Sequence, residues 1–161
     1  GWREPNSLID FHTGPIYEAT RRGLGSALLR KPAKLARLVG GLVEGSPLPV
    51  SVKIRLGWDR DSLNYLDVAD AAQQGGASWL TVHGRTRNDR YVVPVDLKAI
   101  YDIKQHLQIP VFGNGNIFSK KDAEYMQDKT DVDGVMVSRG ALGNPWVFSE
   151  RDFKIFSLYN L

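Results

Sequence analysis

Short apolar runs alternate with longer stretches of helical periodicity along most of this chain, and this alternation limits its fold more than any other feature. Strands are predicted at Leu8–Phe11, Val50–Leu56, Trp79–Val82, around Val111-Phe112 and at Gly134–Val137. Helices are predicted at Pro32–Val43, Leu63–Gln74, Leu97–Leu107 and Lys120–Gln127. Strands separated by helices pair in parallel. The pattern therefore predicts an α/β fold, either an open doubly wound sheet or a barrel.

Local signals support several of these boundaries. The segment VSVKIRL at Val50–Leu56 is brief and rich in β-branched residues, as strands are. The pair Gly75-Gly76 is a typical end for the helix before it. Ser119 precedes a run that begins with charged residues, which is the usual position of a helix N-cap.

Composition narrows the function classes. With 161 residues, 42% of them hydrophobic, the chain has the size and composition of one globular domain. It has no cysteine, so we expect neither disulfides nor a thiolate metal site, and no metal. No apolar run approaches the roughly 18 residues of a membrane span, and GWREPNSL lacks a signal-peptide core, so we expect a cytoplasmic location. The net charge of +3 is compatible with a nucleic-acid partner.

Polar residues and glycines gather directly after the predicted strands. These are Lys53 and Arg55, then His83-Gly84-Arg85, then Asn114-Gly115-Asn116, and finally Ser138-Arg139-Gly140. The carboxyl ends of parallel strands form the ligand-binding face of α/β folds. We therefore expect these residues to meet at one site.

The last two of these groups have the character of a phosphate site, because glycine-rich loops let backbone N–H groups approach an anion. The alternative is that both are ordinary turns, in which glycine and asparagine are common. Lys53 lies inside an apolar strand and either meets an anion or extends to water. His83 is either a ligand-contacting or a structural histidine.

Four further segments and their order resemble the tRNA-dihydrouridine synthase family. They are VKIRLGW (Val52–Trp58), TVHGRTR (Thr81–Arg87), PVFGNGNI (Pro110–Ile117) and DGVMVSRGALGNPW (Asp133–Trp146). GLGSALLRKP (Gly23–Pro32) is similar to the segment that follows the family's catalytic loop. The resemblance extends from about Asp10 to Phe148.

The resemblance implies an FMN-binding (β/α)8 TIM barrel that reduces the C5=C6 bond of uridine in tRNA, with NADPH as reductant. It implies that Lys53 faces the pyrimidine edge of the flavin and that His83 also contacts the cofactor. It assigns the FMN phosphate to Asn114, Gly115, Asn116, Ser138, Arg139 and Gly140. Arg55, Arg85 and His12 would contact the uridine or the tRNA.

The chain departs from the family at its fourth-strand motif, Asp-Ile-Asn-x-Gly-Cys-Pro. Here the sequence is Asp10-Phe11-His12-Thr13-Gly14-Pro15, so histidine replaces asparagine and the cysteine expected between Gly14 and Pro15 is missing. In the family this cysteine is the general acid. Either the cysteine is lost, or a modified residue at this place is not written in the sequence. Asn116 and Ser138 replace the usual aspartate and glycine.

By the same resemblance, residues 8–148 carry the C-terminal five strands of the barrel and the first three are missing, as is the helical tRNA-binding domain. Residues 1–7 and 149–161 stay unassigned flanks. Because five strands cannot close the usual barrel, we expect a fragment, the product of a degraded gene, or a piece that needs a partner chain.

Two other functions remain open. The first is a non-catalytic remnant that binds RNA phosphates through basic residues, namely Arg21, Arg22, Lys53, Arg55, Arg85, Arg87 and Arg90. The second is an FMN barrel of the dihydroorotate dehydrogenase kind, which would share the phosphate loops and the strand lysine. That alternative does not explain VHGRTR or RGALGNPW.

Overall fold

The chain forms an α/β fold in which strands and helices alternate. The computed structural model describes residues 25–148, and residues 9–12 by their backbone. The strands are β1 (Ile9–His12), β2 (Val50–Arg55), β3 (Trp79–His83), β4 (Val111–Asn114) and β5 (Gly134–Met136). The α-helices are α2 (Pro32–Gly45), α3 (Tyr65–Gln74), α4 (Leu97–His106) and α5 (Lys120–Thr130), and short 3-10 helices are η1 (Gly25–Arg30), η2 (Arg60–Ser62), η3 (Arg139–Ala141) and η4 (Pro145–Phe148). The predicted α/β class is confirmed.

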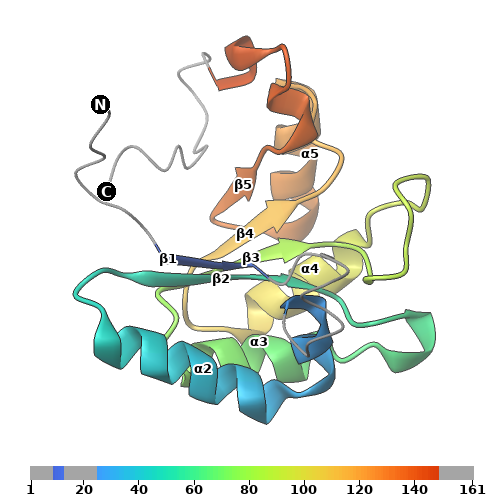
Figure 1. The fold of residues 1–161 in the computed structure, drawn as a ribbon. Helices are drawn as coiled ribbons and strands as arrows, with labels where there is room; N and C mark the ends of the chain where they lie inside the picture. The colour runs from blue at the N-terminus through green and yellow to red at the C-terminus, as the bar shows by residue number, and fades with distance from the viewer. Residues whose placement is uncertain (1–8, 13–24, 149–161) are drawn as a thin grey trace.

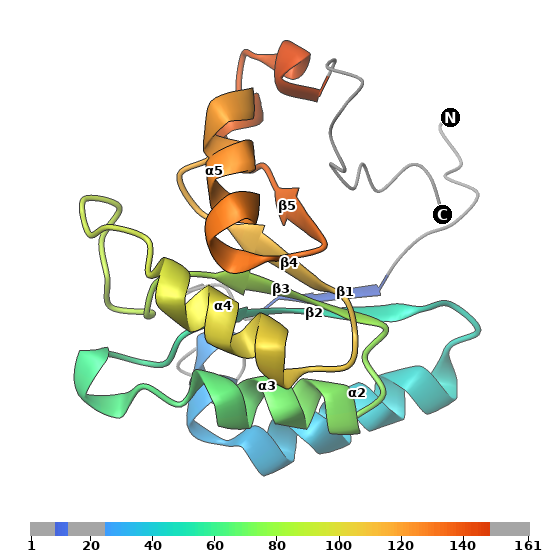
Figure 2. The same cartoon turned by 180° about the vertical axis from the view of Figure 1, so that it is seen from behind.

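The strands lie in one sheet in the order of the sequence, β1-β2-β3-β4-β5, and every pair is parallel. The helices α2 to α5 follow one another along a single face of this twisted sheet (Figures 1 and 2). A doubly wound sheet instead reverses its strand order and carries helices on both faces. The described elements therefore have the winding of a (β/α) barrel, consistent with part of one.

The two-residue period of β2 separates the core from the opposite face of the sheet. Val50, Val52 and Ile54 are essentially inaccessible and belong to the hydrophobic core that β2 shares with the helices. Because successive side chains of a strand point to opposite faces, Lys53 and Arg55 lie on the face without helices. The apolar residues of the neighbouring strand, such as Leu80, join the same core.

The register then aligns the polar residues of neighbouring strands. Arg55 lies opposite His83, and His83 lies opposite Asn114. On the other side of β2, His12 lies opposite Lys53. The polar positions that follow from alternation therefore form a row across the carboxyl half of the sheet.

Helix starts show why the sequence signals were informative. The Ser119 side chain accepts a hydrogen bond from Asp122 N at 3.3 Å, so the predicted N-cap of α5 is confirmed. Asp96 caps α4 in the same way through Ala99 N, at 3.0 Å. Within residues 25–148 and the β1 backbone, no helix is both long and apolar enough to cross a membrane.

The core predicts a matched pair of stability effects. Val52→Ala removes two methyl groups from a position with 0% exposure and should lower the free energy of unfolding by about 2 to 3 kcal/mol. Val92→Ala makes the same change at 88% exposure and should alter it by less than about 0.5 kcal/mol. Urea unfolding followed by circular dichroism measures both, and equal losses would contradict this core.

Candidate functional site

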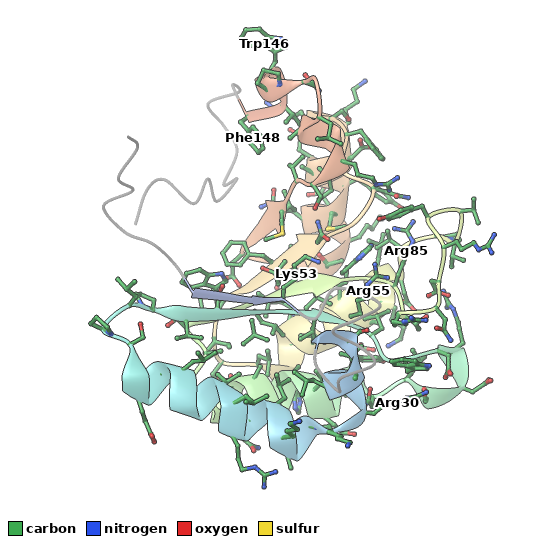
Figure 3. All side chains as sticks on the ribbon, viewed as in Figure 1. Arg30, Lys53, Arg55, Arg85, Trp146 and Phe148 are labelled. Atoms are coloured by element: carbon green, nitrogen blue, oxygen red, sulfur yellow. The ribbon has the colours of Figure 1, made fainter. Side chains whose placement is uncertain are left out.

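A cavity of about 360 Å³ lies where the strands β2 to β5 end. Its lining comes from the ends of β2 to β5 and from the loops that follow β3, β4 and β5. The lining residues are Lys53, Arg55, His83, Tyr91, Asn114, Gly115, Asn116, Ile117, Phe118, Met136, Ser138, Arg139 and Gly140. Figure 3 shows Lys53 and Arg55 along the sheet, well away from Trp146 and Phe148 beyond β5.

The structure brings most of the residues proposed from the sequence into this one cavity. The eight residues predicted to contact the cofactor all line it, and so does Arg55. Arg85 is fully buried and is not among the lining residues. His12 is described only by its strand register, and Gly14 and Pro15 lie outside the described residues. The chemical roles of all these residues stay predictions.

The cavity is strongly positive. Its lining includes the cations Lys53, Arg55 and Arg139, and no carboxylate among the described residues lines it. Burial lowers the pKa of the Arg55 guanidinium, which also donates to Thr86 O at 2.7 Å. A cavity of this kind favours an anionic ligand, because an anion compensates cations that burial has separated from water.

His83 is uncharged in this surrounding. Burial, followed by the positive charges of Arg55 and Lys53 and then of Arg85 and Arg139, lowers the pKa of the imidazole from its ordinary 6.5 to about 3. At neutral pH the ring is therefore a hydrogen-bonding group and not a fourth cation.

Two aromatic rings hold Arg139 at the mouth of the cavity. Its guanidinium carbon lies 3.7 Å from the ring centroid of Tyr91 and 5.4 Å from that of Phe118. Both rings are about half exposed, and cation–π contacts of this kind orient a guanidinium. Sequence reasoning missed both rings, since nothing local connects the loop after β3 with Arg139.

The loops after β4 and β5 fit closely against each other. The Asn114 side-chain amide donates from Nδ2 to Met136 O at 2.7 Å and to Ser138 Oγ at 3.1 Å. A Cβ atom at Gly140 would collide with Ile117 O, so only glycine allows this approach. Asn116 adopts the left-handed conformation, with φ of 54°, which asparagine tolerates better than most residues.

The loop after β3 is fixed by its own polar network. Asp89 accepts hydrogen bonds from Thr86 N at 2.8 Å and from the Arg60 side chain, with which it also forms an ion pair at 3.2 Å. Burial opposes the ionisation of Asp89, but these hydrogen bonds outweigh it and lower the pKa of the carboxyl. The network holds the backbone that presents Tyr91 to the cavity.

Comparisons with known proteins agree with the family resemblance. The model of the dihydrouridine synthase (Dus) family matches residues 6–157. The chain is 40% identical over 142 residues to tRNA-dihydrouridine synthase B of Pasteurella multocida, covering 88% of this chain and 43% of that protein. It is 42% identical over 146 residues to tRNA-dihydrouridine synthase B of Pseudomonas aeruginosa, covering 90% of this chain and 44% of that protein. It is 38% identical over 144 residues to tRNA-dihydrouridine synthase B of Shewanella oneidensis, covering 89% of this chain and 45% of that protein. The chain thus spans less than half the length of these relatives.

The close fit of the loops after β4 and β5 predicts opposite effects of a glycine-to-alanine substitution at two positions. Gly140→Ala should lower the free energy of unfolding by more than about 1 kcal/mol, because the new methyl group displaces the loop after β4. Gly41→Ala, inside α2 with nothing within 4 Å of the added atom, should raise it by about 0.5 to 1 kcal/mol. Urea denaturation of both variants measures these changes in the free energy of unfolding. An unchanged value for Gly140→Ala would mean that the loops do not meet as described.

The histidine predicts a defined pH dependence. Since the folded-state pKa of His83 lies near 3 and the unfolded one near 6.5, only the unfolded chain takes up this proton between those values. The free energy of unfolding should therefore fall as the pH drops from about 6.5 toward 3, and this part of the loss should be absent in His83→Gln. Unfolding curves at several pH values for both proteins measure the difference, and parallel pH profiles would contradict a buried neutral His83.

Proposed function

This chain belongs to the dihydrouridine synthase family, and we propose that it is the flavin-binding part of a tRNA-dihydrouridine synthase. In this proposal the whole protein reduces the C5=C6 bond of uridine in tRNA. The observation that carries the proposal is the single cavity in which Lys53, His83 and two glycine-containing loops meet. The family match over residues 6–157 supports it independently.

We propose that residues 8–148 are the C-terminal five strands of an incomplete (β/α)8 TIM barrel, with residues 1–7 and 149–161 as flanks. The sequential parallel order and the one-sided helices support this arrangement. Five strands cannot close with the usual shear. The other strands would come from an N-terminal segment or from a partner chain, and either would bury the helix-free face of the sheet.

The loops after β4 and β5 are suited to the phosphate of FMN. Asn114, Gly115 and Asn116 would bind it from one side, and Ser138, Arg139 and Gly140 from the other. The fit rests on three features, namely the Arg139 guanidinium, glycine backbone that lets an anion approach, and a lining without carboxylates among the described residues. The N-terminus of α5 is less suited, because Asp122 already accepts from Phe118 N at 3.0 Å there.

Lys53 and His83 would contact the flavin ring. Bound FMN would supply hydride chemistry, with NADPH as the source of the hydride. Lys53, 9% exposed on the helix-free face, would place its positive charge against the pyrimidine edge of the ring. His83 would add a hydrogen bond without adding charge, since its pKa is far below neutral.

Arg55 and His12 would orient the uridine or the tRNA, whereas Arg85 is fully buried and does not line the cavity. No residue is assigned as the catalytic acid. The segment Asp10–Pro15 lacks the cysteine of the family motif. Without that acid, we expect a chain that binds FMN but protonates uridine C5 poorly.

The missing cysteine favours one alternative, a remnant that binds RNA without chemistry. Its basic residues would include Arg87, whose guanidinium carbon lies 4.8 Å from the ring centroid of Trp58. The guanidinium carbon of Arg30 lies 3.7 Å from the same centroid. Arg21 and Arg22 lie outside the described residues. Salt-sensitive binding of tRNA without NADPH-dependent dihydrouridine formation would favour this alternative. A barrel of the dihydroorotate dehydrogenase kind has no comparable support, because the family match is to dihydrouridine synthases.

Titration of the chain with FMN, followed by quenching of flavin fluorescence, tests the proposal. The wild-type chain should bind FMN, and Lys53→Met should weaken binding roughly 10- to 100-fold, as expected for loss of a charge-assisted hydrogen bond. Lys121→Met, an exposed lysine on α5, is the matched control and should bind like the wild type. Failure of the wild type to bind FMN would overturn the proposal, as would unchanged binding by Lys53→Met.

A further inference from the structure

Arg85 is the most completely buried cation of the described chain, and each of its three guanidinium nitrogens lies within hydrogen-bond distance of a neighbouring group. Its exposed fraction is 0%. Its Nε donates to Val93 O at 2.6 Å, and one terminal nitrogen donates to Tyr91 O at 3.0 Å and to Asn116 Oδ1 at 3.1 Å. The other terminal nitrogen lies 3.2 Å from His83 Nε2. It therefore connects the loops after β3 and β4 without lining the cavity.

The contact with His83 determines which ring nitrogen carries the proton. A guanidinium has only donors, so His83 Nε2 must be the acceptor of this hydrogen bond. A neutral imidazole that accepts at Nε2 has its proton on Nδ1. The Nδ1 atom lies on the ring edge opposite Gly115, whose added Cβ would lie 3.1 Å from His83 Cδ2 and 3.4 Å from Nε2. His83 itself lines the cavity.

The contact of Arg85 with Asn116 likewise occupies the acceptor of a side chain that has both an acceptor and a donor. Asparagine carries both an acceptor oxygen and a donor amide. Arg85 engages the oxygen, so the amide Nδ2 with its two N–H donors remains as the other end of the group. Asn114 differs, because its own Nδ2 is used on Met136 O and Ser138 Oγ.

We propose that Arg85 is a positioning residue that binds the acceptor atoms of His83 and Asn116 and leaves their donors to the ligand. The proposal rests on the function proposed above and adds that the cavity selects a ligand rich in hydrogen-bond acceptors at these two places. It gives Arg85 a role through His83 and Asn116 and not on the substrate. An Arg85 contact with the uridine would require the four hydrogen bonds to be broken.

Electrostatics acts in the same direction. His83 lies on β3, and four charged groups act on its ring. Arg55 and Lys53 come from the neighbouring strand β2, Arg85 from the loop after β3, and Arg139 from the loop after β5. All are positive, so a proton on Nε2 would face a guanidinium and meet further cations. The hydrogen-bond geometry and the surrounding charges therefore favour the same neutral tautomer.

Nitrogen-15 NMR of the histidine side chains tests this inference without any ligand. In the wild-type chain at neutral pH, His83 should show a protonated Nδ1 and an unprotonated Nε2, and His83→Gln identifies its signals among the three histidines. An Nε2-protonated or doubly protonated ring would overturn the inference.

Variants then test the role of Arg85. Arg85→Met, of similar length but without donors, should give a mixture of both tautomers and weaken FMN binding about 10- to 100-fold. Arg85→Lys keeps the charge but not the forked geometry, so it should change the tautomer population and the FMN affinity less. It replaces Arg85→Met in the test if Arg85→Met does not fold. Arg37→Met, the same change at an exposed position on α2, is the control and should change neither property. An Nδ1-protonated ring retained in a folded Arg85→Met or Arg85→Lys would overturn the positioning role.

The two proposals fail differently. Addition of FMN to the wild-type chain should shift the His83 Nδ1 signal. If FMN does not bind while the tautomer is as expected, the proposed function fails and the tautomer assignment stands. If FMN binds without shifting this signal, the cavity-facing donor is wrong although the flavin function stands.

Discussion

The two-residue alternation of side chains along β2 and β3 is the constraint on which the rest of the structure depends. It sends Val52 and Ile54 into the core with the helices, and Lys53 and Arg55 to the opposite face. A shift of one residue would place both cations in the apolar core, at a cost of several kcal/mol for each charge. The register between strands is therefore strongly specified, and with it the meeting of Arg55, His83 and Asn114 at one end of the sheet.

The same arrangement concentrates positive charge, and the neighbouring groups limit its cost. Thr86 O accepts from Arg55, the rings of Tyr91 and Phe118 lie against Arg139, and His83 stays neutral. None of these partners removes the net charge. An anion in the cavity would do so, and binding to the folded state alone would also stabilise the chain by mass action. In the proposed function, charge that is unfavourable for folding would thus become the basis of ligand affinity.

Much of this architecture was predictable from sequence because it depends on local signals. Apolar periodicity located every described α-helix and strand to within a few residues but none of the short 3-10 helices, and the Ser119 cap followed from residue type. The cavity was predictable because parallel strands bring their carboxyl ends together. Contacts between distant loops were not predictable from the sequence, because no local pattern links Tyr91 to Arg139 or Arg85 to Asn116. For the same reason, the sequence does not show that Arg85, expected at the substrate from the family resemblance, is fully buried and outside the cavity lining.

Chemical-shift mapping of the backbone amides during addition of FMN tests the central claim most directly, because it locates the ligand on the fold. The account predicts that the amides of residues 114–116 and 138–140 shift together with that of Lys53. Amides at the opposite end of the strands, such as those of Gly76 and Gln108, should stay unchanged. Shifts confined to that opposite end, or spread over the helices, would contradict a flavin site at the carboxyl ends of the strands.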